Sequence, residues 1–372
     1  MMKTQTCSIS WLVAKIVALG VAGSLSACGG SDYGGGGSMY TPPPPPPPMV
    51  AYVAKSLVAD TVGTAANTDA KLINAWGIAF NPAGFVWVAN NGTSTSTLYD
   101  GNGMPQTLMV AVPGSPTGIV FNSSSTDFKV SQNGVSGASA FMFVGESGTL
   151  SGWSPSVNLN NVITVADGSA SGKVYKGLAI GNYLGVNYVY AADFHNGAID
   201  VYNGTFAKVS LPGGFLDASL PAGYAPFGIQ VIGSRIYVAY AKQDAQAHDD
   251  VAGAGLGIVD VFDTGGTFIK QLVKGGALNS PWGMAMAPAN FGPLSGMLLV
   301  ANFGDGKINA YDATTGSFAG TVSKADGAPI VIDGLWGIAF GNGINNQPLN
   351  TLFFTAGPGG EAHGLYGRID VQ

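Results

Sequence analysis

The stretch NAWGIAFNPAGFVWVANNG, residues 74–92, holds two short apolar runs separated by a turn. The same phrase returns as PWGMAMAP at 281–288 and as LWGIAFG at 335–341. Aligned on the glycine that opens the first apolar run, six copies are found, at Gly77, Gly118, Gly177, Gly228, Gly283 and Gly337. Their spacings are 41, 59, 51, 55 and 54 residues. An internal period of this size is typical of a solenoid or a propeller.

Each copy also contains further strand-like segments. A second apolar run follows each first run, at 86–89, 141–144, 188–191, 236–239, 298–301 and 352–355. Runs that are apolar on both faces indicate strands buried on both faces, as inner strands between neighbouring blades are. A third, more alternating strand follows at 98–100, 150–153, 199–202, 258–262, 308–311 and 367–371. Weaker fourth strands are expected at 108–112, 162–165, 206–209, 268–273 and 318–322.

The sixth unit has no fourth strand after its third one, but Tyr52–Leu57 is a strand-like segment that precedes the first unit. Placed as the outer strand of the sixth unit, it closes the ring and removes two open sheet edges. We therefore predict an all-β fold for residues 50–372, a six-bladed β-propeller with its N-terminal strand in the last blade. The six glycines are expected to be scaffold positions, because a residue without Cβ lets crowded inner strands approach one another.

The N-terminal 49 residues are expected to contain a targeting signal followed by a tether. An apolar run leads into Leu25-Ser26-Ala27-Cys28, which resembles a bacterial lipobox. Residues 1–27 are then a lipoprotein signal peptide, and Cys28 is the lipid attachment site. The alternatives are an ordinary secretory signal cut near Ala27 and a membrane anchor. Residues 28–49, rich in Gly and with seven consecutive prolines, are expected to be a tether. The expected location is the cell envelope, anchored by lipid at the outer membrane, or alternatively the outside of the cell.

Composition limits the possible partners. The chain of 372 residues carries a formal charge of −6, has 10% charged residues and contains 57 glycines. An acidic chain without a basic cluster is a poor nucleic-acid binder, because phosphate contact requires concentrated Lys and Arg. No nucleic-acid partner is therefore expected.

The whole predicted propeller resembles NHL-type repeats, and more closely a bacterial family of exported propeller proteins with no established activity. The matching segments are Ser56–Asp60, Leu72–Ile78, Thr97–Gly101, Tyr240–Asp244 and His248–Asp250. Some members of that family end in a PEP-CTERM sorting tail. This chain carries a lipobox instead, which departs from the family pattern.

Topology places most of the candidate site residues on one face. Because the second strand of each unit runs antiparallel to the first, its end lies beside the start of the first. Candidate hard-cation ligands follow second strands in four units: Asn90, Glu146, Asp193 and Asn302. Oxygen ligands suit a divalent cation such as Ca²⁺. Six-bladed lactonases, which the fold resembles, hold a metal in a similar place. The alternative is that these residues cap turns.

The same face gathers aromatic and ionisable residues that could contact a ligand. These candidates are Trp76, Lys176, His195, Tyr240, His248, Asp249, Asp250, Trp282, Trp336 and His363. The aromatic rings could stack on a sugar or a peptide, or could fill the space between blades. Two hypotheses follow: a binding or scaffold module for an unknown protein, glycan or small molecule, and a metal-dependent lactonase or esterase. No Gly-x-Ser-x-Gly nucleophile motif is present.

Overall fold

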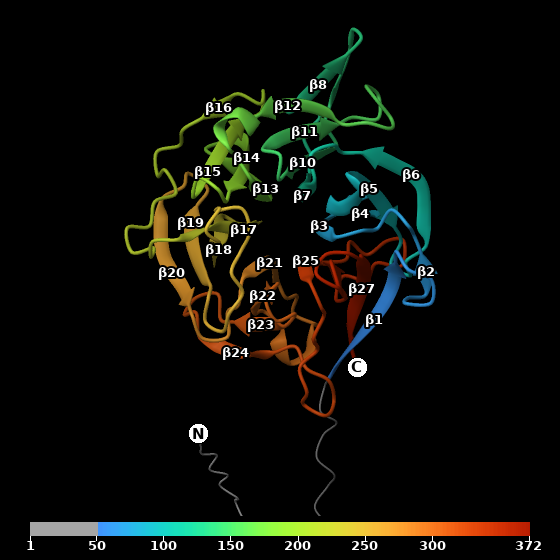
Figure 1. Ribbon diagram of the computed structural model, residues 1–372, viewed down its shortest axis with the longest axis vertical. Coiled ribbons are helices and arrows are strands. Elements are labelled where there is room, and N and C mark those ends of the chain that lie inside the picture. The colour runs from blue at the N-terminus through green and yellow to red at the C-terminus, as the bar shows by residue number, and fades with distance from the viewer. Residues whose placement is uncertain (1–50) are drawn as a thin grey trace, which may run out of the picture. The chain divides into compact units, whose positions relative to one another are not determined.

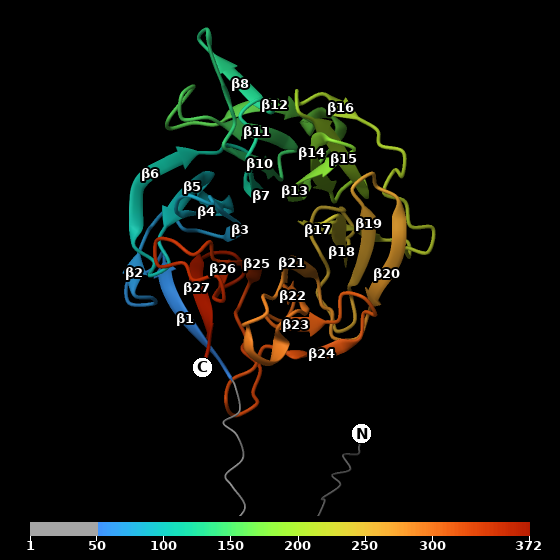
Figure 2. The same ribbon diagram turned by 180° about the vertical axis from the view of Figure 1, so that it is seen from behind.

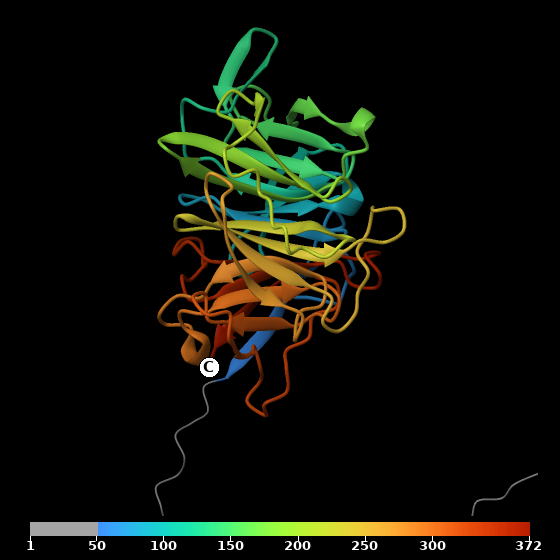
Figure 3. The same cartoon turned by 90° about the vertical axis from the view of Figure 1, so that its left-hand side faces the viewer.

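Six sheets surround a central channel in the computed structural model, which describes residues 51–372 (Figure 1). Five sheets have four antiparallel strands, and the sixth has five. The view from behind shows the same ring (Figure 2), and the side view shows the blades stacked around it (Figure 3). The predicted fold class, a six-bladed β-propeller, is confirmed.

The first three blades occupy residues 75–209. Blade 1 consists of β3 (Ala75–Phe80), β4 (Val86–Asn90), β5 (Thr95–Tyr99) and β6 (Pro105–Ala111). Blade 2 consists of β7 (Pro116–Phe121), β10 (Phe141–Gly145), β11 (Thr149–Trp153) and β12 (Ile163–Asp167). Blade 3 consists of β13 (Tyr175–Tyr183), β14 (Val186–Asp193), β15 (Ala198–Asn203) and β16 (Lys208–Val209).

The last three blades follow the same plan. Blade 4 consists of β17 (Tyr224–Ile232), β18 (Arg235–Lys242), β19 (Ile258–Asp263) and β20 (Phe268–Lys274). Blade 5 consists of β21 (Pro281–Met286), β22 (Leu298–Asn302), β23 (Ile308–Tyr311) and β24 (Phe318–Thr321). Blade 6 consists of β25 (Leu335–Phe340), β26 (Leu352–Ala356), β27 (Leu365–Val371), β1 (Tyr52–Ala59) and the short β2 (Asn67–Thr68). Three short 3₁₀ turns are η1 (Asn91–Thr93), η2 (Ser169–Ser171) and η3 (Gly292–Leu294).

Strand β1 closes the ring as predicted. It pairs antiparallel with β27 over its whole length, so the two ends of the propeller share one sheet (Figure 1). The Tyr52 hydroxyl adds a link to blade 5, because it donates to the Phe291 carbonyl (2.7 Å) and accepts from the Leu294 N–H (3.1 Å). Backbone pairing and this buried side chain together hold the first strand in the last blade.

The hydrophobic core lies between neighbouring blades. Every residue of β4, β10, β22 and β26 is buried, as their unbroken apolar sequences predict. Between blades 1 and 2, for example, the ring of Trp87 stacks on Phe141 with centroids 4.3 Å apart and contacts Trp153.

The six repeat glycines form a closed ring of backbone contacts. A Cβ added at Gly77, Gly177, Gly228, Gly283 or Gly337 would lie 2.0–2.9 Å from the carbonyl oxygen of the residue before the next glycine around the ring. At Gly118 it would lie 2.5 Å from the backbone nitrogen of Leu178. These glycines are therefore scaffold positions, as expected, because each lets two neighbouring inner strands approach.

One element of blade 2 was not predicted. Between β7 and β10, the strands β8 (Lys129–Gln132) and β9 (Val135–Ala138) form a separate hairpin that projects outward (Figure 3). Its base is held by Phe128 and Val130, both buried in the core between blades 2 and 3. Its sequence is short and mostly polar, so the periodicity of the repeat did not reveal it.

The predicted signal peptide (1–27), the lipid attachment site Cys28 and the tether (28–49) lie outside the described residues. In the part of the chain that the structure describes, no helix is long and apolar enough to cross a membrane.

Candidate functional site

The candidate site lies at the end of the channel where the innermost strands begin, here called the mouth. Each blade brings the end of its second strand beside the start of its first, as predicted. Ala75 pairs with Asn90, Tyr175 with Asp193 and Pro281 with Asn302. The loops between second and third strands emerge at the same end.

A β-bulge at the residue before or at each repeat glycine shapes the mouth. The register between first and second strands shifts at this point in all six blades. A bulge re-aims side chains that a regular strand would point elsewhere. The residues at this position are Trp76, Thr117, Lys176, Phe227, Trp282 and Trp336.

Aromatic side chains from several blades form a plug, defined by Trp76, Phe194, Phe227, Trp282, Phe303 and Trp336. Trp336 is its centre, with ring centroids 3.8 Å from Trp76, 3.9 Å from Phe303 and 5.9 Å from Trp282. Trp76 and Trp336 are each only 1% exposed. These two rings pack against one another, which leaves them little surface for stacking on a sugar.

Asn74 connects the plug to the polar residues above it. Its Oδ1 accepts hydrogen bonds from the indole N–H groups of Trp76 (2.8 Å) and Trp336 (3.1 Å). Its Nδ2 donates to Glu361 Oε2 (2.7 Å) and to Asn91 Oδ1 (3.3 Å). Asn74 has a φ of +47°, a conformation that Asn tolerates better than most residues.

Lys176 is the hub of a charged network at the mouth. Its side chain is 1% exposed, and its ammonium contacts Glu146 Oε1 (2.5 Å) and Asp249 Oδ1 (3.0 Å). The same ammonium lies 5.0 Å from the centroid of the Trp76 ring, within cation–π range. Glu146 Oε2 accepts from Asn91 Nδ2 (2.8 Å). Blades 1, 2, 3 and 4 thus meet around a single ammonium group.

The long loop 242–255 of blade 4 brings Asp249 to this network. His248 Nδ1 lies 3.0 Å from Asp249 Oδ1, and His195 Nδ1 lies 3.2 Å from the carbonyl of Ala247. Gln243 Nε2 donates to the Phe194 carbonyl (2.6 Å), which joins the loop to the plug. The loop therefore lies over the mouth between blades 3 and 4, with Asp249 64% exposed.

The mouth carries an excess of negative charge. Burial, together with the nearby carboxylates of Glu146 and Asp249, raises the pKa of Glu361. Burial also raises the pKa of Asp250, whereas the Lys176 ammonium lowers the pKa of Asp249 against the effect of burial. Four carboxyl groups, those of Glu146, Asp249, Asp250 and Glu361, thus interact electrostatically with one lysine. Burial is the main cause of both raised pKa values, and a cation bound nearby would favour the charged forms of Glu361 and Asp250.

The four predicted cation ligands have different hydrogen-bond partners. Glu146 belongs to the Lys176 network, but Asp193 contacts Lys173 (3.0 Å) and Asn196 (2.9 Å) instead. The buried amide of Asn90 donates to the hydroxyls of Thr95 and Thr97 within blade 1. Asn302 donates to the Ala277 carbonyl (2.8 Å) and to Asp305 Oδ1 (3.0 Å). Each of these three residues is bound within or beside its own blade.

A different set of possible ligands is close together. One side-chain atom each from Glu146, His248 and Asp249 lie within 4.8 Å of one another. The Lys176 ammonium already contacts both carboxylates, so a metal ion at these atoms would have to displace it or bind beside it. In the structure, the Lys176 ammonium occupies the position that a metal cation would take beside Glu146 and Asp249.

Tyr240 and His363 lie apart from the network, whereas Trp282 contacts the backbone of Lys176. Tyr240 is buried in the core cluster of blades 3 and 4. His363 Nδ1 contacts Asp60 Oδ2 (2.9 Å) within blade 6, where the loop before β27 meets the end of β1 and the His363 side chain is half exposed. Trp282 is partly buried and donates from Nε1 to the Lys176 carbonyl (3.0 Å).

Three residues of the network were missed from the sequence: Asn74, Asn91 and Glu361. Asn74 and Asn91 lie near the two ends of the stretch 74–92, but the pattern of residues that directly follow second strands selects Asn90 and not Asn91. Comparison of the six repeats offers one signal, because Lys176 stands where four other blades have an aromatic residue. Closing a ring of similar blades does not require a lysine at this position, so Lys176 indicates a role beyond the scaffold.

Comparisons with known proteins identify relatives of the whole propeller. The chain is 34% identical over 326 residues to the "Uncharacterized protein R648" of Acanthamoeba polyphaga mimivirus. The match covers 84% of this chain and 78% of the viral protein. The chain belongs to the family of this protein. No protein-family model matches the chain.

Two solved structures share the fold at low sequence identity. A protein of unknown function from Bacteroides thetaiotaomicron superimposes with a TM-score of 0.56 at 12% identity, covering 87% of this chain and 76% of that one. A glucose dehydrogenase gives a TM-score of 0.52 at 11% identity, covering 85% and 99%. These likenesses support the NHL-like propeller fold alone. The relative identified by sequence is viral, and the bacterial family, export and lipid anchor stay predictions.

Proposed function

We propose that this protein is an exported, lipid-anchored binding module that recognises a cationic group at the mouth of its propeller. Export and anchoring rest on the lipobox at Cys28 and the tether that follows it. The binding role rests on the network around Lys176. A location at the cell envelope would present this network to a soluble ligand or to a neighbouring protein.

The observation that carries the proposal is the asymmetric clustering of Glu146, Asp249, Asp250 and Glu361 around one buried ammonium. Closing a ring of six similar blades does not require such a cluster of carboxyl groups around a lysine. Two of these carboxyl groups, those of Glu146 and Asp249, contact the ammonium of the buried Lys176 side chain. The carboxyl groups beyond those that contact Lys176 leave negative charge for a second cation, and low-dielectric surroundings strengthen such an interaction.

Thermal unfolding of the full chain in detergent tests the proposal. Bound metals are first stripped, and then Ca²⁺, Mn²⁺ or the polyamine spermidine is titrated. A ligand at about 100 times its Kd should stabilise the fold by about 2.7 kcal/mol, which is a measurable rise in melting temperature. Glu361→Gln and Asp249→Asn should each reduce the rise.

The matched control is Asp312→Asn, which removes a carboxylate in a turn of blade 5 (β23–β24) where Asp312 accepts from the Thr314 and Thr315 N–H groups. This variant should keep the full response. The absence of a response to every probe, or an equal response in all variants, would contradict recognition of cations at the mouth.

One observation favours a second function, a metal-dependent hydrolase of the lactonase or esterase type. Glu146, His248 and Asp249 bring ligand atoms within 4.8 Å of one another. A divalent ion there could activate a water molecule, with His248 close enough to ligate it or to move a proton. This alternative predicts stabilisation by Ca²⁺ or Mn²⁺ but not by spermidine. It also predicts hydrolysis of simple lactones or esters that is lost in Glu146→Gln.

A further inference from the structure

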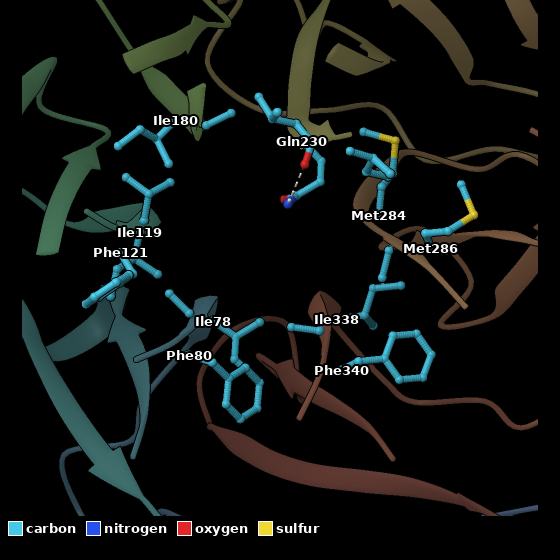
Figure 4. Close-up of a pocket in the computed structure, with 17 residues that line it drawn as sticks. Ile78, Phe80, Ile119, Phe121, Ile180, Gln230, Met284, Met286, Ile338 and Phe340 are labelled. Carbon is cyan, nitrogen blue, oxygen red and sulfur yellow. Dashed lines mark hydrogen bonds between the residues drawn. The ribbon is translucent and has the colours of Figure 1, made fainter. Parts of the chain in front are cut away.

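The other end of the channel is an open cavity whose lining side chains are almost all apolar. A volume of about 450 Å³ lies between the second halves of the six innermost strands (Figure 4). This is within the size range of small-molecule pockets in proteins. The cavity opens at the face opposite the mouth, because it is lined by the ends of the innermost strands, whereas the plug lies at their beginnings.

The lining has a consistent chemistry. All six blades contribute, through 78–80, 119–121, 179–180, 230–232, 284–286 and 338–340. Sixteen of the seventeen lining side chains are alanine, valine, isoleucine, methionine or phenylalanine, and none carries a charge. A charged ligand would lose its hydration here without gaining an ion pair, and would therefore bind poorly.

Gln230 is the single polar side chain of the lining, and it points toward the centre of the channel (Figure 4). The five other blades have Ala79, Val120, Ala179, Ala285 and Ala339 at this position. Gln230 is exposed, and the hydrogen bond of its Nε2 to the Val231 carbonyl is long at 3.5 Å. Its amide is therefore free to donate to and accept from a molecule in the cavity.

The cavity narrows toward the mouth. A smaller space of about 40 Å³ continues below it, between the repeat glycines and Trp282. Beyond this space lies the plug, whose two central indoles are almost fully buried. A molecule that enters from the open face thus meets apolar side chains and one side-chain amide, set among the backbone of the innermost strands.

From these observations we infer that the channel binds an uncharged, predominantly apolar small molecule that bears one hydrogen-bonding group. The apolar part occupies the space between the isoleucine, methionine and phenylalanine side chains, and the polar group pairs with the Gln230 amide. This site is separate from the mouth, and its occupation does not depend on the charged network around Lys176.

Fluorescence titration of the full chain with N-phenyl-1-naphthylamine tests the inference. This probe is uncharged and apolar, and it carries one N–H group. We expect saturable binding of one probe per chain. Ala339→Phe places a ring in the cavity and should weaken binding at least tenfold. The control Ala170→Leu adds apolar surface at an exposed residue of η2 and should stay within twofold of the unaltered chain.

A second variant tests the role of Gln230 without blocking the cavity. Competition against the bound probe compares 2-naphthol with naphthalene, which differ by a hydroxyl group. The unaltered chain should prefer 2-naphthol severalfold after correction for its solubility, because only 2-naphthol can pair with the amide. Gln230→Leu should remove this preference while still binding naphthalene.

Circular dichroism of each variant confirms that it is folded before its affinity is compared. The inference is overturned if the full chain shows no saturable probe binding. It is equally overturned if Ala339→Phe binds as well as Ala170→Leu, or if Gln230→Leu retains the preference for 2-naphthol.

Discussion

At the scale of single residues, the propeller depends on positions where a side chain has no room. The ring of repeat glycines is the clearest case, because each one faces the backbone of the next blade. A Cβ at Gly228 would lie 2.0 Å from the Trp282 carbonyl oxygen, whereas one at Gly177 would lie 2.9 Å from that of Phe227. The penalty for adding a methyl group should follow this difference in space.

We therefore predict that Gly228→Ala destabilises the protein more than Gly177→Ala. Overpacking against backbone costs about 1–3 kcal/mol and occasionally more, so we expect Gly228→Ala at or above the top of that range and Gly177→Ala near its lower end. Urea unfolding of both variants measures the difference. Equal effects would mean that the inner strands shift freely, and that the glycines are not the reason for their close approach.

Asp260 of β19 is a second residue whose setting makes a clear prediction. Its side chain is fully buried, and neither carboxyl oxygen has a hydrogen-bond partner within residues 51–372. Burial, reinforced by the nearby Asp217 carboxylate, raises the pKa of Asp260 to about 8. A neutral Asp260 could donate to Asp217, so the folded protein favours the protonated form.

Because this pKa is above its unfolded value, the folded state holds a proton that the unfolded state has released between about pH 4 and pH 8. The stability of the protein should fall with rising pH in this window, by at most about 1.4 kcal/mol per pH unit from this group. The Asp260→Asn variant has no ionisable group at this position, so this contribution to the pH dependence of stability is absent. We expect the variant to gain stability relative to the unaltered chain from pH 5 to pH 8, and the gain to level off above that. Urea unfolding at pH 5, 7 and 9 would contradict this if the difference were constant.

At the scale of elements, strand β1 determines whether the ring closes. Its pairing with β27 is supplemented by Tyr52, whose hydroxyl makes two buried hydrogen bonds to the loop around η3 of blade 5. The strand is thus fixed to two blades at once.

We predict that Tyr52→Phe lowers the free energy of unfolding by about 1–3 kcal/mol, because the Phe291 carbonyl and the Leu294 N–H are left without this partner. Tyr224→Phe is the matched control, since its hydroxyl makes no hydrogen bond within the described propeller. A Tyr52→Phe variant as stable as this control would show that backbone pairing alone closes the ring.

The elements of the repeat were predictable because each depends on local patterns. The glycines, the buried second strands and the closing strand all recur or complete a period, so they could be found without coordinates. The hairpin β8–β9 could not, because a short polar insertion has no partner in the repeat. The mouth was only partly predictable. Glu146 and Asp249 lie 30 and 73 residues from Lys176 in sequence, and their meeting depends on a β-bulge and on the path of a long loop.

At the scale of the whole molecule, the two ends of the channel differ in chemistry. The mouth is filled by aromatic rings and carries several carboxyl groups, whereas the opposite end is an open cavity whose side chains are almost all apolar. Both ends are built from the same six innermost strands. The propeller can thus present two unrelated surfaces, of which the mouth is the one proposed to recognise a cationic group.

Chemical rescue of the Lys176→Ala variant by a small ammonium ion tests whether the mouth recognises a cationic group. Removing the side chain leaves Glu146 and Asp249 without their ammonium partner, and the melting temperature should fall. Ethylammonium chloride, compared with sodium chloride at equal ionic strength, should restore part of the loss in this variant and have little effect on Lys208→Ala, whose lysine is half exposed and pairs with Asp200. Selective rescue of Lys176→Ala is the predicted result. If ethylammonium raised the melting temperature of both variants equally, or of neither, the mouth would not be a site that recognises cations.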